Sequence, residues 1–190
     1  LLHEAVANAV PEGSYPVYCN GMKELTAMSG SIEDGSGPMH DYENDLDCTW
    51  RISPQDSVES IELEFLKMAM DPNDQLIIYE GIDETASIAG SISGYDLPQA
   101  LSVDGSHVYL QFISDADSVA DGWLLAYNAV QPEYCSTINT VSDSASVISD
   151  GSNDYMYQNS TYCNWFIQPD GAERIHFEFL ELDIEEGDFL

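Results

Sequence analysis

A pattern of tyrosine, cysteine and tryptophan occurs twice in this chain, at Tyr42–Ile52 and again at Tyr157–Ile167. In each copy the tyrosine lies eight residues before the tryptophan, and the cysteine lies two residues before it. The apolar run Ile61–Phe65 is matched in the same way by Ile175–Phe179, and the offset stays between 114 and 116 residues. A period of this length is that of a whole domain and is far too long for a solenoid repeat.

This period predicts how the 190 residues are divided. We expect residues 1–17 to be the tail of a preceding domain and a linker, residues 18–130 to form a complete domain, and residues 131–190 to form a partial second copy. From Cys135 to Leu190 the second copy has only 56 residues. Half a domain leaves apolar faces and strand edges uncovered, so we expect the chain to be part of a longer protein.

Apolar residues alternate with polar residues in the first copy. Ile61, Leu63 and Phe65 alternate with glutamates, and the segments 108–112 and 123–127 follow the same period of two. Between these runs lie Gly, Pro and Asp-Gly pairs, which are typical of turns. Short strands separated by turns, with no helical pattern between them, predict an all-β antiparallel sandwich.

The chain is strongly acidic. It has 35 Asp and Glu against 4 Lys and Arg, a net charge of -31. Nucleic acids and anionic membranes are therefore poor partners, because binding to them depends on Lys and Arg. No apolar run is long enough to insert into a membrane. The carboxylates either form a solvated surface or include a few that converge on cations.

Four cysteines are divided equally between the copies, spaced 29 residues apart in the first and 28 in the second. The chain contains no CxxC motif and no pair of histidines at zinc-binding spacing. One disulfide in each copy, Cys19–Cys48 and Cys135–Cys163, explains the count better than a metal-thiolate site. Disulfides indicate an oxidising compartment, so we expect a secreted or cell-surface protein.

Together these residues resemble the CUB domain family of extracellular, jelly-roll-like β-sandwiches. The resemblance covers Cys19 to Val130 and the first half of a second copy. It is carried by Cys19 and Cys48, Tyr42 with Cys48-Thr-Trp50, the Ile61–Phe65 strand, Asp74–Gly81, Ser93-Gly94 with Pro98, Phe112–Asp115, and Gly122-Trp123 leading to Tyr127. The resemblance implies a CUB unit followed by a truncated second unit.

The resemblance also implies a calcium site. The calcium-binding members of the family use a tyrosine six residues before the second cysteine, and three acidic residues from two loops. Carried over to this sequence, these positions are Tyr42, Asp71, Asp74 and Asp115, with Asp117 and Ser118 placed to add oxygens, and in the second copy Tyr157, Glu185 and Asp188. Calcium prefers six to eight oxygen ligands, which such loops can supply. The alternative is that these residues form ordinary polar turns.

We therefore expect a non-catalytic binding module, built of tandem CUB units, that makes calcium-dependent contacts with an extracellular protein or glycan. Lys or Arg of the partner would bind the remaining carboxylate oxygens. The parent protein would be secreted or on the cell surface, such as a hydrolase or an adhesin. The alternative is a structural spacer with no specific ligand. Catalysis is not expected, because His107 and His176 lie on polar strand faces, where a solvated imidazole is the commoner role.

One short motif is independent of these expectations. Asn159-Ser-Thr161 matches the N-x-[ST] sequence that accepts N-linked glycans. The motif has meaning only in a eukaryotic secretory pathway, and it also arises by chance in Ser-rich segments.

Overall fold

A computed structural model describes residues 15–135, 137–152 and 155–190 of the chain. The predicted tail at residues 1–17 lies almost wholly outside these ranges. The described residues contain strands and no helix, and accordingly no helix that could cross a membrane. The chain divides into two compact units, unit 1 ending at Pro132 and unit 2 covering Glu133–Leu190.

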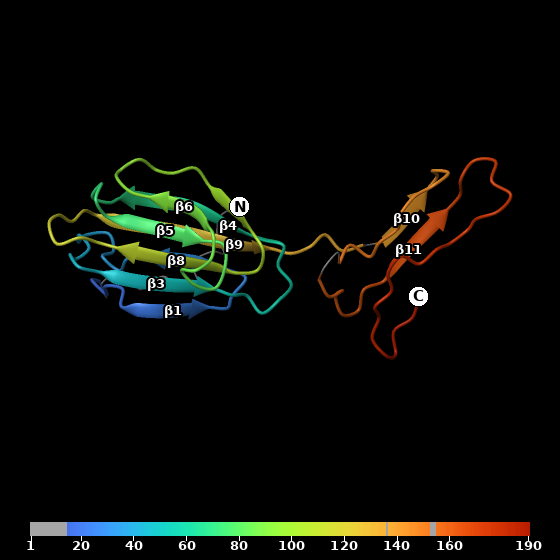
Figure 1. The fold of residues 1–190 in the computed structure, drawn as a ribbon, viewed down its shortest axis with the longest axis horizontal. Helices are drawn as coiled ribbons and strands as arrows, with labels where there is room; N and C mark the ends of the chain where they lie inside the picture. Colours follow the sequence, from blue (N-terminus) through green and yellow to red (C-terminus); the bar gives the residue numbers. More distant parts are fainter. Residues whose placement is uncertain (1–14, 136, 153–154) are drawn as a thin grey trace. The chain divides into compact units, whose positions relative to one another are not determined.

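One layer of unit 1 is a five-stranded sheet, visible face-on in Figure 1. Its strands, in order across the sheet, are β1 (Gly21–Leu25), β3 (Asp47–Ile52), β8 (Val108–Ile113), β5 (Gln75–Tyr79) and β6 (Ile88–Ile92). Neighbouring strands are antiparallel except at one edge, where β1 pairs with β3 in parallel.

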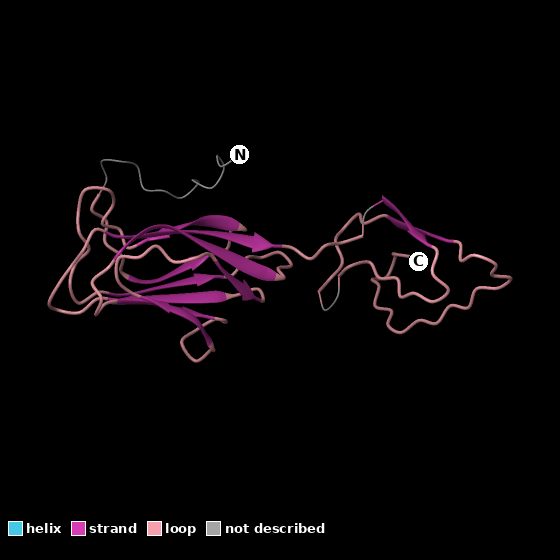
Figure 2. Ribbon diagram, turned by 90° about the horizontal axis from the view of Figure 1, so that it is seen from above, coloured by secondary structure: helices cyan, strands magenta, loops and turns pink. Residues whose placement is uncertain are grey.

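The other layer is a four-stranded, fully antiparallel sheet. Its strands, in order, are β2 (Ser29–Glu33), β9 (Gly122–Val130), β4 (Ser60–Ala69) and β7 (Leu101–Asp104). Figure 2 shows the two layers of unit 1 from above. The all-β sandwich predicted from the alternating pattern is therefore confirmed.

The core lies between the two sheets and follows the strand period. Ile61, Leu63 and Phe65 of β4 are buried while the intervening glutamates are exposed. A β-bulge between Phe65 and Lys67 then adds one residue, so Leu66 is exposed and burial resumes at Met68. Without this bulge, Met68 would face solvent.

Aromatic side chains join the two sheets. Trp50 of β3 packs edge-on against Trp123 of β9, with ring centroids 5.3 Å apart. Phe112 of β8 contacts the same Trp123 at 5.8 Å, and Tyr42 contacts Phe112 at 5.3 Å. Trp50 and Trp123 are buried. Tyr42 thus connects the core to the loops at its end.

Both predicted disulfides are present, Cys19–Cys48 in unit 1 and Cys135–Cys163 in unit 2. In unit 2 the strands β10 (Thr137–Val141) and β11 (Cys163–Ile167) pair in parallel. This repeats the parallel pairing of β1 with β3, which the sequence pattern did not predict. Trp165 on β11 is only half-buried, unlike its counterpart Trp50.

Candidate functional site

Two loops of unit 1, residues 42–46 and 114–120, are fastened together by the buried Ser114. Its hydroxyl donates to the carbonyl of Glu43 at 2.8 Å and accepts from the amide of Leu46 at 2.9 Å. The Asn44 side chain adds a bond from Nδ2 to the Ala116 carbonyl at 3.0 Å. These contacts fix the loop that follows β8 against the loop that precedes β3.

The third loop, residues 70–74, joins them through Tyr42. The Tyr42 hydroxyl donates to Oδ2 of Asp74 and accepts from the Asp71 amide at 2.8 Å. Asp74 is fully buried, and its Oδ1 accepts from the Asp115 amide at 2.8 Å. One carboxylate therefore connects all three loops.

Asp71 and Asp115 are less buried than Asp74, and their carboxylates bind within their own loops. Oδ1 of Asp71 accepts from the amide and the side chain of Asn73, both at 3.0 Å. Oδ1 of Asp115 accepts from the amide of Asp117 at 2.9 Å and from that of Ser118 at 3.4 Å. The structure therefore brings the loops of all six predicted unit 1 residues to one end of the sandwich.

The three carboxylates do not form a cage around one point. Within the described residues, no three His, Cys, Asp or Glu side chains are grouped closely enough to hold a metal ion. The donor set nevertheless fits calcium, because it offers carboxylate and hydroxyl oxygens and no nitrogen or sulfur. The fully buried Asp74 is the strongest sign of fit, since its two hydrogen-bond donors, Tyr42 and the Asp115 amide, are both uncharged in their ordinary states.

Burial and the bond to Asp74 raise the pKa of Tyr42 above its ordinary value, although the Asp71 amide acts against this. Burial is the largest of these causes. The tyrosine is thus held in its protonated form, which is the form that can donate to a carboxylate.

Unit 2 repeats the tyrosine contacts. The Tyr157 hydroxyl donates to Oδ2 of Asp188 and accepts from the Glu185 amide at 2.9 Å. The bond to Asp188 is the main cause that raises the pKa of Tyr157. Glu185 and Asp188 are exposed, in contrast to the buried Asp74. The three residues predicted from the repeat therefore lie together, in an open arrangement.

Sequence reasoning missed the two side chains that fasten the loops of unit 1, Ser114 and Asn44. The repeat contained a signal for Asn44, because Asn159 occupies the same position, two residues after the tyrosine. Ser114 directly precedes Asp115, but its identity alone does not show that it is buried.

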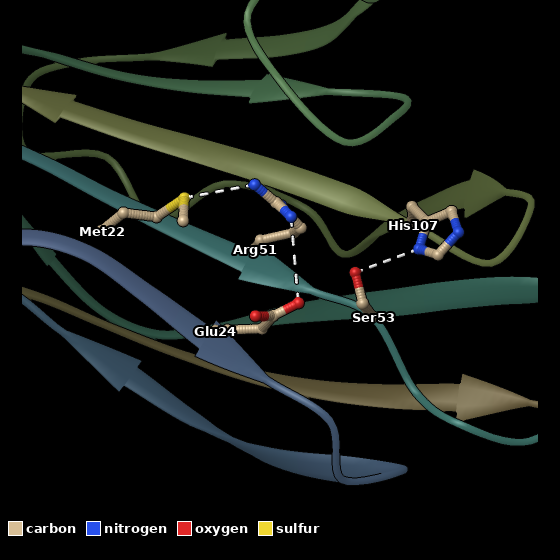
Figure 3. A network of polar contacts seen from close by, with 5 residues as sticks. All are labelled: Met22, Glu24, Arg51, Ser53 and His107. Carbon is tan, nitrogen blue, oxygen red and sulfur yellow. Dashed lines mark hydrogen bonds and ion pairs between the residues drawn. The ribbon is translucent and has the colours of Figure 1, made fainter.

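Figure 3 shows a second polar network, on the face of the five-stranded sheet that lies away from the core. Arg51 forms an ion pair with Glu24, at 3.8 Å between Nη1 and Oε1, and donates from Nη2 to the Met22 sulfur. His107 makes a hydrogen bond with Ser53 at 3.0 Å. No acidic side chain bonds this histidine within the described residues, so the pair lacks the third member of a catalytic triad.

Comparisons with known proteins agree with this architecture. The family model described as "CUB domain" matches residues 19–127. The exoskeleton protein RP43 of Riftia pachyptila is 26% identical over 176 residues, covering 89% of this chain and 40% of RP43. A match of that length must extend into unit 2. The chain spans 40% of RP43 and smaller shares of other relatives it matches.

Among solved structures, the CUB1-EGF-CUB2 domain of human MASP-1/3 matches with a TM-score of 0.50 and 23% identity, covering 60% of this chain and 43% of that one. The MASP-1 CUB2 domain bound to Ca2+ matches with a TM-score of 0.49 and 22% identity, covering 56% of this chain and 96% of that domain. At this identity, the likeness to the human MASP-1/3 structure concerns the fold alone, and the likeness to the MASP-1 CUB2 domain carries nothing further for this chain.

Proposed function

Because this chain belongs to the CUB domain family, we propose that it is a non-catalytic extracellular module whose unit 1 makes calcium-dependent contacts with a protein or glycan. CUB domains are generally binding modules, and they occur in secreted and cell-surface proteins. The proposal for this chain rests on the loop end of unit 1 and on its chemistry.

The observation that carries the proposal is the burial of Asp74 at the point where the loops of Asp71 and Asp115 meet. A buried carboxylate costs free energy unless a charge or several hydrogen bonds compensate it. Here the compensation is one tyrosine hydroxyl and one backbone amide, and the described residues place no Lys or Arg in an ion pair with Asp74. Bound calcium would supply the missing positive charge. Each Asp74 oxygen keeps a lone pair for this purpose.

The other residues have roles that follow from their positions. Tyr42 orients Asp74 and bonds the Asp71 amide, so it fixes two of the three loops relative to each other. Asp71 and Asp115 each hold one carboxylate oxygen, Oδ2, that accepts no side-chain or backbone bond within the described residues. Asp117 and Ser118 are exposed beside Asp115 and can add oxygens.

The partner's chemistry follows from charge. With a net charge of -31, the chain attracts cationic surfaces over a Debye length at physiological salt. Carboxylate oxygens at the loop end can accept bonds from Lys or Arg of a partner. We therefore propose a basic patch on an extracellular protein, or a glycan, as the partner. The parent protein would be a secreted or surface protein such as a hydrolase or an adhesin.

We further propose the domain boundaries that the repeat predicts, a CUB domain over residues 18–130 and the beginning of a second over 131–190. Unit 2 supports this with three features that match unit 1. It has a disulfide and a parallel strand pair at the matching positions. The backbone amide of Cys135 also donates to the carbonyl of Asp150, as the amide of Cys19 donates to the carbonyl of Asp34.

The proposal is tested by thermal unfolding of the full chain in EDTA, in calcium and in magnesium at equal ionic strength. At about 100 times the dissociation constant, a ligand of the folded state adds about 2.7 kcal/mol to its stability. We expect calcium to raise the midpoint well above magnesium, and Asp74→Asn to remove that difference. The control is Asp104→Asn, which alters an exposed carboxylate on β7. Equal effects of both cations would indicate screening of net charge and would refute the calcium site.

The alternative function, a structural spacer, is favoured by one observation. Asp71 and Asp115 already bond amides of their own loops, as aspartates in polar turns do. In a spacer, substitution of these residues changes stability by the same amount in calcium and in EDTA. The same unfolding experiment therefore separates the two functions.

A further inference from the structure

We propose that Asn159 is an acceptor site for an N-linked glycan. The sequence Asn159-Ser160-Thr161 is the one place in the 190 residues where an asparagine is followed two positions later by Ser or Thr, with no Pro between. The inference does not depend on calcium binding, because it concerns a different side chain of unit 2.

The structure presents this motif in a form that an enzyme can reach. Gln158, Asn159 and Ser160 are exposed, and the motif ends before β11 begins at Cys163. Ser160 has a positive φ of 63°, and the Thr161 amide bonds back to the Gln158 carbonyl at 3.3 Å. The motif therefore lies on a surface turn. It is not within a strand, where backbone hydrogen bonds to a neighbouring strand would hold it. The Asn159 amide group makes no side-chain hydrogen bond within the described part of unit 2.

The same repeat position in unit 1 is used differently. Asn44 also lies two residues after the tyrosine, but its Nδ2 donates to the Ala116 carbonyl at 3.0 Å. Two residues further on is Leu46, which packs against the core and has no hydroxyl. Both asparagines are exposed, but unit 1 uses the side chain of Asn44 to fasten a loop, whereas unit 2 supplies the hydroxyl of Thr161 that an acceptor requires.

The reaction is a group transfer with a lipid-linked oligosaccharide as the donor. Nδ2 of Asn159 attacks the anomeric carbon of the first sugar, loses one proton and forms the N-glycosidic bond, and the lipid pyrophosphate leaves. The reaction takes place in the secretory pathway of eukaryotes, a compartment that also permits disulfides such as the two of this chain.

The position of the glycan has a consequence for binding. Asn159 is two residues from Tyr157, whose hydroxyl contacts Asp188. A glycan there stands beside the acidic loops of unit 2, and unit 1 has no acceptor at the matching place. Contacts with a protein partner at this end would therefore differ between the two units.

The test is secretion of the full chain, behind a secretion signal, from a eukaryotic cell line. We expect peptide-N-glycosidase to lower its apparent mass in a single step, and peptide mapping to place the released site at Asn159. Asn159→Gln and Thr161→Ala should both abolish the shift. Ser160→Gly is the matched control, because it preserves the acceptor sequence and glycine accepts the positive φ; this variant should keep the shift.

If the secreted parent chain shows no change in apparent mass after treatment with peptide-N-glycosidase, the proposal is overturned. A shift that persists in Asn159→Gln would also overturn it, since the glycan would then be elsewhere. If a variant is not secreted, peptide mapping of the parent chain still decides the matter. None of these outcomes bears on calcium binding, which is measured on the loops of unit 1.

Discussion

The Tyr157 hydroxyl donates a hydrogen bond to the Asp188 carboxylate across 31 residues of sequence. Tyr42 makes the corresponding bond to Asp74 across 32 residues. In both units the hydroxyl also accepts a bond from the amide three residues before the aspartate, at 2.8 Å in unit 1 and 2.9 Å in unit 2. The two units therefore repeat a local arrangement of hydrogen bonds as well as a sequence pattern. A tyrosine hydroxyl that both donates and accepts is the element that is repeated.

The first prediction concerns this hydroxyl. Tyr42→Phe leaves the buried Asp74 with one donor fewer and the Asp71 amide without an acceptor. Loss of a partner for buried polar groups costs about 1–3 kcal/mol, so we expect the free energy of unfolding in EDTA to fall by that amount. Urea unfolding followed by tryptophan fluorescence measures it, since Trp50 and Trp123 are buried in the same core.

The control for this substitution is Tyr109→Phe. Tyr109 is also buried, but its hydroxyl makes no side-chain hydrogen bond within the described residues. Its removal should change stability by less than about 0.5 kcal/mol. Equal losses in the two variants would mean that removal of any buried tyrosine hydroxyl, and not loss of the bond to Asp74, determines the effect.

The second prediction ranks the carboxylates by burial. Asp74 is fully buried, Asp115 is half-buried and Asp117 is exposed. If all three act toward calcium, Asp74→Asn should remove the calcium-dependent rise in midpoint, Asp115→Asn should remove most of it, and Asp117→Asn should reduce it slightly. A buried charge is screened least by salt, which is the reason for this order. The measurement is the midpoint in calcium minus that in EDTA for each variant, and a reversed order would contradict the assignment.

The strand positions that could be predicted are those where side chains alternate strictly between core and solvent. Ile61, Leu63 and Phe65 are the best example. The parallel edge strand β1 could not be predicted, because only Leu25 at its end is buried and no alternation marks the other four residues. The bulge after Phe65 could not be predicted either, because the residue types do not show where a strand gains a residue.

The site shows the same limit. The resemblance to CUB domains implied that Asp71, Asp74 and Asp115 come from loops that supply one site, and the structure brings these loops together. The sequence could not show that Asp71 and Asp115 bond their own loop amides, because an aspartate in a turn and an aspartate that binds a cation are the same residue type in the same kind of loop. Trp165, the repeat counterpart of the buried Trp50, is only half-buried, because the described residues of unit 2 include no strands matching β8 and β9, which cover Trp50.

The third prediction concerns Asp34, a second buried carboxylate of unit 1. Oδ1 accepts from the Ser36 amide at 2.8 Å, and Oδ2 accepts from the Trp123 amide at 2.5 Å. Asp34→Ala leaves two buried amides without partners, so we expect a loss of about 1–3 kcal/mol for each. Asp121→Ala is the control, because Asp121 is exposed and contributes only its carbonyl to the side-chain contacts nearby. Calorimetric unfolding compares the two, and a mild effect at Asp34 would show that water replaces the carboxylate.

The fourth prediction is a loss of stability at alkaline pH. Burial is the largest cause that raises the pKa of Tyr42 and of Tyr127, and burial followed by the bond to Glu33 raises the pKa of Tyr15 to about 12. The folded state therefore keeps these hydroxyls protonated at pH values where the unfolded chain ionises them, near 10. Their contribution to stability is complete below pH 10 and is lost as the pH rises through the folded pKa values.

This loss can be assigned to Tyr42 by comparing slopes. The free energy of unfolding of the parent should decline between about pH 10 and 12. That of Tyr42→Phe should decline less steeply, because the variant lacks the Tyr42 hydroxyl proton, one of the protons whose loss is coupled to unfolding. Tyr95→Phe, at an exposed ring, should keep the parent slope. Repulsion among the acidic side chains also grows with tyrosine ionisation, but it acts on both variants alike. A Tyr42→Phe slope equal to that of the parent would therefore mean that Tyr42 is ionised as readily in the folded state as in the unfolded chain, against the burial and the Asp74 bond seen here.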